Sequence, residues 1–355
     1  MDKYRIDSHK LIYHVDRVSD WKNGELIYPI YMEISPSGAC NHRCTFCALD
    51  FMEYQKRYLD AGMIQGRLSE MGKLGLRSVM YAGEGEPFLH KEMENIILHT
   101  KNSNIDVAIT TNGVLFKEDL AERVLGSVEW IKTSINGATN DTYAKIHQSR
   151  VSDFDAVVRN MSYAAKVKRK NGYKCALGMQ LLLIPENKHE VFLLAKLARD
   201  IGMDYLVIKP YSQHPLSKTS KYKDVKYSEY MDFADRLKEY NTSGFSAIFR
   251  GNTMKKWDEA EKNYRCCLSL PFWSYMDAGG GVWGCSMYLG DKRFYYGNVY
   301  DNTFQEIWEG DKRLKSLKWV ENELDVSMCR LNCRMDEVNR YLWDLKNPVE
   351  HVNFI

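Results

Sequence analysis

Three closely spaced cysteines, Cys40, Cys44 and Cys47, are the residues of this chain best suited to chemistry. They lie in the stretch SPSGACNHRCTFCALDF, which puts three thiols on one loop in the pattern Cys-x3-Cys-x2-Cys. Thiolates are the usual ligands of a [4Fe–4S] cluster, and four of them complete its shell. Three thiols can hold three irons and leave the fourth iron able to bind and reduce a substrate. A zinc site or ordinary free thiols are the alternatives.

A second group of cysteines lies in the last third of the chain: Cys266, Cys267, Cys285, Cys329 and Cys333. Four thiolates from an opening pair and a late pair could close one further [4Fe–4S] cluster or a zinc site, because tetrahedral thiolate suits both. Adjacent cysteines rarely ligate the same metal, so one of Cys266 and Cys267 should be left over. The remaining cysteine, Cys175, starts an apolar run and is expected in the core.

Composition narrows the class of protein. The 355 residues hold 49 Lys and Arg against 47 Asp and Glu, so no strong field steers the chain to nucleic acid or to a membrane surface. No apolar run approaches the roughly 20 residues of a membrane span, and the N-terminus does not resemble a signal peptide. Nine cysteines without an export signal favour metal ligation over disulfides. We therefore expect a cytoplasmic protein without nucleic-acid or membrane partners.

The elements that position the first cysteines form an alternating pattern between about residues 28 and 210. Six short runs are apolar on both faces, which is typical of buried parallel strands. Apolar residues at helical spacing separate them, as in 59–74 and 191–201. The pairs Ser152 with Asp155 and Asn187 with Glu190 look like capping boxes. The six expected strands are Ile30–Ser35, Ser78–Ala82, Val107–Thr111, Trp130–Ser134, Leu177–Ile184 and Tyr205–Lys209.

Six βα units in sequence predict an α/β fold with a parallel sheet that curls as a partial (β/α)6, TIM-like barrel or lies open. In a parallel barrel, functional groups occupy the loops that follow the carboxyl ends of the strands. The Cys40 loop follows the first strand and should therefore lie at the barrel mouth.

With the cysteine loop after the first strand and Phe46 before its last cysteine, the sequence resembles the radical S-adenosylmethionine (SAM) superfamily. In that family the iron without a protein ligand chelates the amino and carboxylate groups of SAM. Electron transfer, commonly from a flavodoxin or ferredoxin, then releases a 5′-deoxyadenosyl radical that abstracts hydrogen from the substrate. The resemblance implies SAM and a [4Fe–4S] cluster on Cys40, Cys44 and Cys47.

Two further motifs carry the resemblance. Gly83-Glu84-Gly85-Glu86-Pro87 follows the second strand and is similar to the family's glycine-glutamate-proline motif. Ser134-Ile135-Asn136-Gly137 follows the fourth strand, where polar side chains of the family commonly meet SAM. Each polar residue could instead simply end its strand. The resemblance implies SAM contacts from Gly83, Gly85, Glu86, Ser134 and Asn136.

The cysteine-rich tail resembles the SPASM or Twitch extension found after many radical SAM barrels. This resemblance implies one auxiliary [4Fe–4S] cluster on Cys267, Cys285, Cys329 and Cys333. Too few cysteines remain for a second complete auxiliary cluster. The spare thiol, assigned to Cys266, is either a packing residue or a hydrogen donor that quenches a substrate radical, as some radical epimerases of the superfamily use.

Residues near the later strands are candidates for substrate contacts. Lys209, Tyr211 and His214 follow or end the sixth strand and should point into the same mouth. Lys209 and His214 could anchor a phosphate or carboxylate or move protons, and Tyr211 offers a stacking face. Gln180 is a polar residue within the fifth strand, facing either a ligand or a satisfied core partner. The segment after Lys209 could equally be a linker.

We expect an N-terminal segment (1–27), a radical SAM partial barrel (28–215), a SPASM/Twitch-like domain (216–335) and a C-terminal helix and tail (336–355). The expected function is an oxidoreductase or epimerase that abstracts hydrogen from a small-molecule substrate, either of a carbohydrate type or another polar metabolite. One alternative is a maturase of ribosomal peptides. Such enzymes usually carry an N-terminal peptide-clamping domain, and only about 28 residues precede the first strand here, which disfavours this alternative. A non-catalytic zinc- or iron–sulfur-binding module is the other.

Overall fold

A single curved sheet organises the chain in the computed structural model, which describes residues 3–260 and 262–354. The strands follow the order β10-β9-β8-β1-β2-β3-β4-β5-β6-β7. Neighbours from β8 through β7 run parallel, whereas β9 and β10 are antiparallel additions. The strands are β1 Tyr31–Ile34, β2 Ser78–Tyr81, β3 Asp106–Thr111, β4 Trp130–Ser134, β5 Ala176–Leu183, β6 Tyr205–Pro210, β7 Ser246–Phe249, β8 Trp273–Met276, β9 Gly281–Trp283 and β10 Tyr295–Asn298.

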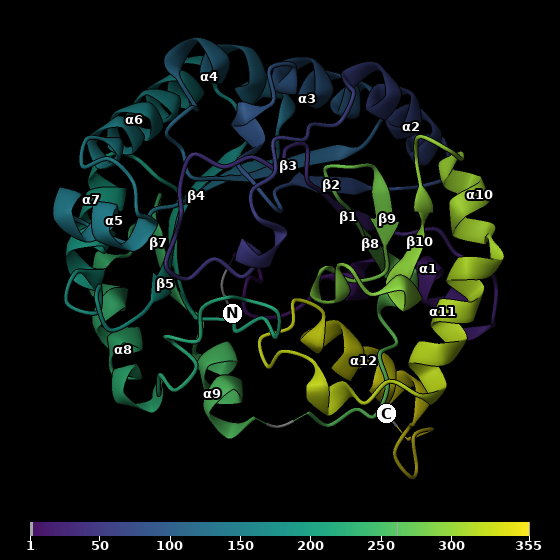
Figure 1. Ribbon diagram of the computed structural model, residues 1–355. Helices are drawn as coiled ribbons and strands as arrows, with labels where there is room; N and C mark the ends of the chain where they lie inside the picture. Colours follow the sequence, from purple (N-terminus) through teal and green to yellow (C-terminus); the bar gives the residue numbers. More distant parts are fainter. Residues whose placement is uncertain (1–2, 261, 355) are drawn as a thin grey trace.

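The helices cover the outer, convex face of this sheet, and the sheet stays open because β7 and β10 form its two ends (Figure 1). The predicted α/β partial barrel of parallel strands is therefore confirmed, and all six expected strands are present. The helices are α1 Val15–Lys22, α2 Ala61–Lys73, α3 Met93–Asn102, α4 Glu118–Val124, α5 Asn140–His147, α6 Asp153–Asn171, α7 Val191–Asp200, α8 Phe233–Leu237, α9 Gly251–Glu259, α10 Phe304–Glu309, α11 Asp311–Asn322 and α12 Asp336–Lys346.

The main core lies between the outer face of the sheet and the helices. On β6, Leu206 and Ile208 belong to this core, whereas Tyr205 and Val207 belong to a separate cluster with Ile248 of β7. Because successive side chains of a strand alternate between faces, the second set points into the barrel. Cys175 is buried in the main core, as predicted.

The two expected capping boxes do not form. Ser152 precedes α6 in helical conformation, and its side chain makes no capping bond. Asn187 instead accepts from the backbone N–H of Ile184 and donates to the carbonyl oxygens of Asn136 and Leu182. This amide joins the segments after β4 and β5, which gains more buried hydrogen bonds than a helix cap would.

The N-terminal segment packs against the start of β6 and against the residues that follow β7. The ring of Tyr4 lies 5.2 Å from that of Tyr205, and Ile6 packs on the same cluster. Asp7 accepts from the guanidinium of Arg250 at 3.2 Å and from the hydroxyl of Thr253 at 2.5 Å. The segment therefore links the amino end of β6 to the carboxyl end of β7.

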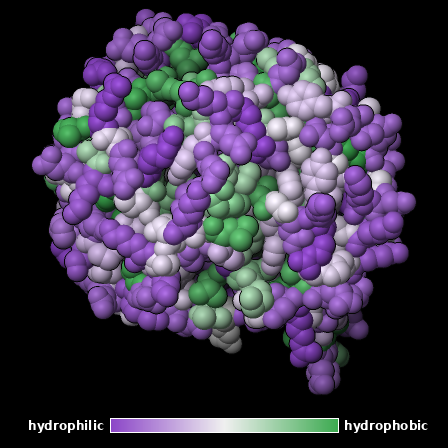
Figure 2. All heavy atoms as spheres, viewed as in Figure 1, coloured by the Kyte–Doolittle hydropathy of each residue, from purple (hydrophilic) through white to green (hydrophobic). Residues whose placement is uncertain are grey.

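A helix of this chain that spanned a lipid bilayer would need about 20 predominantly apolar residues. Among the described residues, no helix combines the length and the apolar character needed to cross a bilayer. The face seen in Figure 2 is mostly hydrophilic, with hydrophobic residues gathered near its middle and lower edge.

Candidate functional site

The first three cysteines lie together on the loop that follows β1. Backbone bonds fix this loop against α5, since the N–H groups of Arg43 and Thr45 donate to the carbonyls of His147 and Ile146 at 3.0 and 2.9 Å. Burial raises the pKa of the Cys40 thiol to about 12. Burial, and then the charges of Cys47 and Cys40, raise the pKa of Cys44. Three thiols that influence one another at a barrel mouth suit the irons of one cluster, whose positive charge stabilises the thiolate forms.

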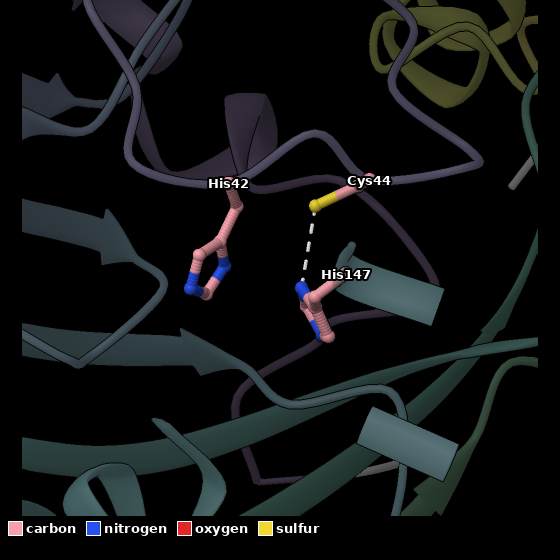
Figure 3. A group of neighbouring side chains, drawn as sticks. All are labelled: His42, Cys44 and His147. Atoms are coloured by element: carbon pink, nitrogen blue, oxygen red, sulfur yellow. Dashed lines mark hydrogen bonds between the residues drawn. The ribbon is translucent and has the colours of Figure 1, made fainter. Parts of the chain in front are cut away.

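A histidine that the sequence analysis missed supports this loop (Figure 3). The Nδ1 atom of His147, at the end of α5, lies 3.2 Å from the Sγ atom of Cys44. Its Nε2 atom lies 3.1 Å from the carbonyl oxygen of Ile135. The potential ligand atoms of His42, Cys44 and His147 lie within 4.8 Å of one another. Because Cys44 belongs to the three-cysteine loop and His42 already pairs with Asp153 at 3.3 Å, we interpret His147 as a hydrogen-bond partner of the sulfur.

Glycines of the motif after β2 pack directly against the cysteine loop. A Cβ atom on Gly85 would lie 2.0 Å from the carbonyl oxygen of Ala39, and Gly83 has a positive φ of 114°. The N–H of Glu86 donates to that same Ala39 oxygen at 2.8 Å. Only glycine permits this approach of two backbones, so the motif sets the position of Cys40.

The Glu86 carboxylate is engaged within the protein. Its two oxygens accept from the Thr111 hydroxyl at 2.5 Å and from the N–H groups of Asn112 and Phe88 at 2.8 and 3.2 Å. Burial raises the pKa of this carboxyl group to about 7, although all three donors act against that shift. The side chain therefore holds the turn after β3, and the predicted contact with a ligand would fall to the neighbouring glycine backbone.

The polar residues after β4 divide into two roles. Asn136 is fully buried, and its Oδ1 atom accepts from the N–H of Leu182 at 2.6 Å, so that it fastens β4 to β5. Ser134 retains accessible surface, and its hydroxyl lies 3.4 Å from the Nε2 atom of Gln180. Ser134 and Gln180 are thus brought together on the inner face, where both were predicted to meet ligands. Asn136 acts as a strand connector.

The three residues predicted near the end of β6 are placed differently from one another. Lys209 keeps accessible surface inside the barrel. Tyr211 is 1% exposed and packs against Tyr222 and Trp257, so its ring offers no free face for stacking. His214 is fully buried and stacks on Phe51 of the cysteine loop, with ring centres 4.7 Å apart. Burial lowers the pKa of His214 to about 4, which leaves the imidazole neutral at pH 7.

The late cysteines converge on a second site. Burial, followed by the charges of Cys333 and Cys267, raises the pKa of Cys285, and burial raises that of Cys267 to about 11. Backbone N–H groups donate to the sulfurs of Cys285 and Cys333, each at 3.4 Å. The hydroxyl of Tyr288 lies 3.2 Å from the sulfur of Cys329. The Nδ2 atom of Asn339 donates to the sulfur of Cys267 at 3.6 Å, and four sulfurs that receive such bonds fit a fully ligated cluster.

Cys266 lies outside this group. Its side chain packs against a separate apolar cluster that contains Leu11, Leu268 and Leu342. The charges that act on its thiol come from Lys346 and Glu321 rather than from the other cysteines. The adjacent cysteines therefore face different environments, and Cys267 is the one that joins the second site.

The second site touches the first loop and the barrel interior. Phe51, four residues after Cys47, packs in one cluster with Cys285 and Cys333. Arg334, next to Cys333, donates to the carboxylate of Glu33 on the inner face of β1. The two cysteine groups thus lie on either side of one shared interior.

Comparison with known proteins agrees with this geometry. Residues 34–198 match the model of the radical SAM superfamily, and residues 267–334 match the SPASM iron–sulfur cluster-binding domain. The chain belongs to the radical SAM superfamily and carries a C-terminal SPASM domain, so that its cofactors are SAM, a [4Fe–4S] cluster and an auxiliary iron–sulfur centre.

Among its relatives is the GTP 3′,8-cyclase of Chlorobaculum tepidum, 25% identical over 201 residues that cover 54% of this chain and 57% of the relative. The GTP 3′,8-cyclase of Aquifex aeolicus is 28% identical over 181 residues, covering 48% of this chain and 53% of that protein. The chain therefore spans little more than half the length of the curated relatives that it matches.

Two solved structures show a similar fold. SuiB of Streptococcus suis bound to S-adenosylmethionine has a TM-score of 0.64 at 18% identity, covering 85% of this chain and 70% of SuiB. The protein anSMEcpe with bound AdoMet has a TM-score of 0.59 at 20% identity, covering 82% and 83% of the two chains.

Proposed function

We propose that this radical SAM enzyme removes hydrogen from a small polar substrate held inside the barrel, in an overall two-electron oxidation. The observation that carries the proposal is the shared interior. Arg334, directly after a cysteine of the second site, reaches Glu33 on the inner face of the first strand. A substrate in this interior lies between the two cysteine groups.

When bound, SAM and the first cluster supply a 5′-deoxyadenosyl radical, and the auxiliary cluster supplies an acceptor for one electron. Loss of a hydrogen atom, and then of one electron and one proton, oxidises the substrate by two electrons. The chain orients the reactants through Ser134 and Gln180 at the inner face. Tyr4 and Ile6 pack against the inner-face cluster of β6 and β7 and so limit the access of water.

Oxidation is favoured over epimerisation by the place of Cys266. An epimerase needs a hydrogen donor that reaches the substrate radical. The thiol of Cys266 instead packs among Leu11, Leu268 and Leu342, whereas the barrel interior lies on the other side of β1 and β8. We therefore leave Cys266 out of the catalytic group and interpret it as a packing residue.

Modification of a peptide is the second candidate. One structure of SuiB is described as bound to the precursor peptide SuiA, and structures of anSMEcpe hold peptides beside AdoMet. These neighbours bind peptides and the sequence relatives are named for GTP, so the expected carbohydrate substrate has no support from the comparisons. An open mouth at the end of the strands suits either a small molecule or one side chain of a peptide.

Anaerobic reconstitution tests the proposal. We expect about eight irons per chain, and SAM cleavage when dithionite or a flavodoxin or ferredoxin donates electrons. The Cys44→Ala variant should keep about half of the iron and lose the cleavage. Bound zinc without cleavage would refute the proposal in favour of a non-catalytic module.

Heavy water distinguishes the reaction types once a substrate is in hand. Dehydrogenation releases a product two hydrogens lighter without deuterium on carbon. Solvent deuterium at a carbon that retains its hydrogen count would instead identify an epimerase. A cytoplasmic location remains a prediction, which fractionation of the source cells would test.

A further inference from the structure

Two lysines project into the barrel from β4 and β6, the strands on either side of β5, and the charge of Lys132 is one of the causes that lower the pKa of Lys209. Lys132 lies on β4 between Ile131, which belongs to the helix-facing core, and Thr133, which bonds to the sulfur of Met161 on α6. Lys209 follows Ile208 on β6, and Ile208 also faces the helices. Alternation along each strand therefore points both ammonium groups inward.

Both lysines are surrounded by protein and yet are not fully buried. Burial is the largest cause that lowers the pKa of Lys132, to about 7, and that of Lys209. Each side chain nevertheless retains accessible surface, so each lines open space within the barrel. In the described part of the chain neither ammonium group has a hydrogen-bond or ion-pair partner; Lys132 has only the ring of Trp130, 5.4 Å away.

The other charges of this interior do not offset the two lysines. Glu33 pairs with Arg334, and Asp7 pairs with Arg250. Each of these carboxylates already has an arginine. A further arginine of this region, Arg330, donates to the hydroxyl of Ser286 at 3.3 Å and so adds positive charge. Two lysines are left in a partly desolvated space without a free counter-charge, so each loses its proton readily when the space is empty and stays an ammonium group when an anion from outside joins it.

The surroundings of Lys132 define one side of this space. Gly178 of β5 pairs in register with Lys132 on one side and with Tyr205 on the other. A Cβ atom on Gly178 would lie 2.1 Å from the Tyr205 ring, so the ring lies across the glycine and forms an aromatic floor. Lys209 stands four residues further along β6 than Tyr205, nearer to the mouth.

We propose that Lys132 and Lys209 form a binding site for an oxyanion group of the substrate, a phosphate or a carboxylate, above the floor made by Tyr205. The inference rests on the proposed function in that it assigns the substrate class of the same interior. Lysine is a point charge that binds such groups without the planar geometry of arginine, and two lysines match a doubly charged group.

Binding of simple anions to the cluster-loaded protein tests the site independently of turnover. We would titrate pyrophosphate, for a phosphoryl group, and malonate, for carboxylates, by anaerobic calorimetry. At least one probe should bind to the wild type, and the stronger probe identifies the chemistry. Lys132→Met and Lys209→Met should each weaken its binding by about 10- to 100-fold, the effect of losing a charge-assisted hydrogen bond.

A matched control is Lys166→Met, which removes an exposed lysine from α6 and should bind the probe like the wild type. Unchanged cluster absorption and circular dichroism would show that the variants fold. The site is refuted if neither probe binds, or if the folded inner variants bind as tightly as Lys166→Met. Loss of SAM cleavage in a wild type that binds the probe would instead refute the proposed function alone.

Discussion

Replacing Gly85 by alanine should disable the first cluster while sparing the second. The new Cβ atom would lie 2.0 Å from the carbonyl oxygen of Ala39 and 2.7 Å from that of Ser37. Carbon and oxygen atoms that are not bonded approach to about 3.3 Å, so one backbone must move by about 1.3 Å. Both contacts are main-chain atoms, and no side-chain rotation can relieve them.

The free-energy cost of this movement comes first from the hydrogen bond that it breaks. The N–H of Glu86 donates to the Ala39 oxygen at 2.8 Å, and losing this bond in a buried loop costs about 1 kcal/mol or more. Overpacking adds about 1–3 kcal/mol. Together the two effects should destabilise the loop around Gly85 by about 2–4 kcal/mol. Cys40 follows Ala39 directly, and metal ligands tolerate displacements of only about 0.2 Å.

The assay is iron content and SAM cleavage after anaerobic reconstitution. We expect about four irons per chain in Gly85→Ala instead of about eight, and no cleavage above background. Gly66→Ala is the matched control, because Gly66 lies in α2 with open space at its Cβ position and alanine there should stabilise the helix by about 1 kcal/mol. Full iron content and normal cleavage in Gly85→Ala would refute the assignment of this glycine.

Two further outcomes are expected. Cys267→Ala should lose about four irons per chain, whereas Cys266→Ala should keep the iron content and the SAM cleavage of the wild type; equal losses in the two variants would contradict the placement of their thiols. Lys132→Met should raise the free energy of unfolding by about 1–2 kcal/mol at pH 6, a figure reduced for the partial exposure of the side chain. Burial, and then Arg334 and Arg250, lower the pKa of Lys132 to about 7 in the folded protein, so the unfolded state binds more protons and wild-type stability should rise from pH 7 to pH 10. Denaturant unfolding at several pH values measures the free energy of unfolding of both proteins. If this free energy changes with pH in parallel in the wild type and the variant, the charge of Lys132 does not destabilise the folded state.

The strands of the barrel were predictable because burial on both faces leaves a plain pattern. Trp130–Ser134 was predicted with the observed bounds, and the other five strands differ by one or two residues. The strands β7 to β10 were not predicted, and all four lie after the segment in which the alternating pattern was recognised. Of these, β8 pairs with β1, far earlier in the chain, and a local pattern carries no trace of such a distant partner.

The candidate site, like the strands, could be predicted only in part from the sequence. The cysteines of both groups were singled out from their spacing together with the family resemblance, whereas a lysine within an apolar strand gave no reason to single out Lys132. Its role depends on the curvature of the open sheet, which turns that face inward. Glu86 and Tyr211 show that residues near a site can have partners within the protein that their type does not reveal: Thr111 and Asn112 donate to Glu86, and Trp257 packs against Tyr211.

The pairing of β8 with β1 has a consequence for biosynthesis. Tyr31 on β1 pairs with Trp273 on β8, which lies more than 200 residues later in the chain. Until the ribosome has released that segment, the first strand presents an unpaired edge beside the loop that must bind iron. Shortened chains that stop before β8 should therefore aggregate rather than yield an isolated radical SAM domain, and cluster loading in the cell should follow completion of the whole chain.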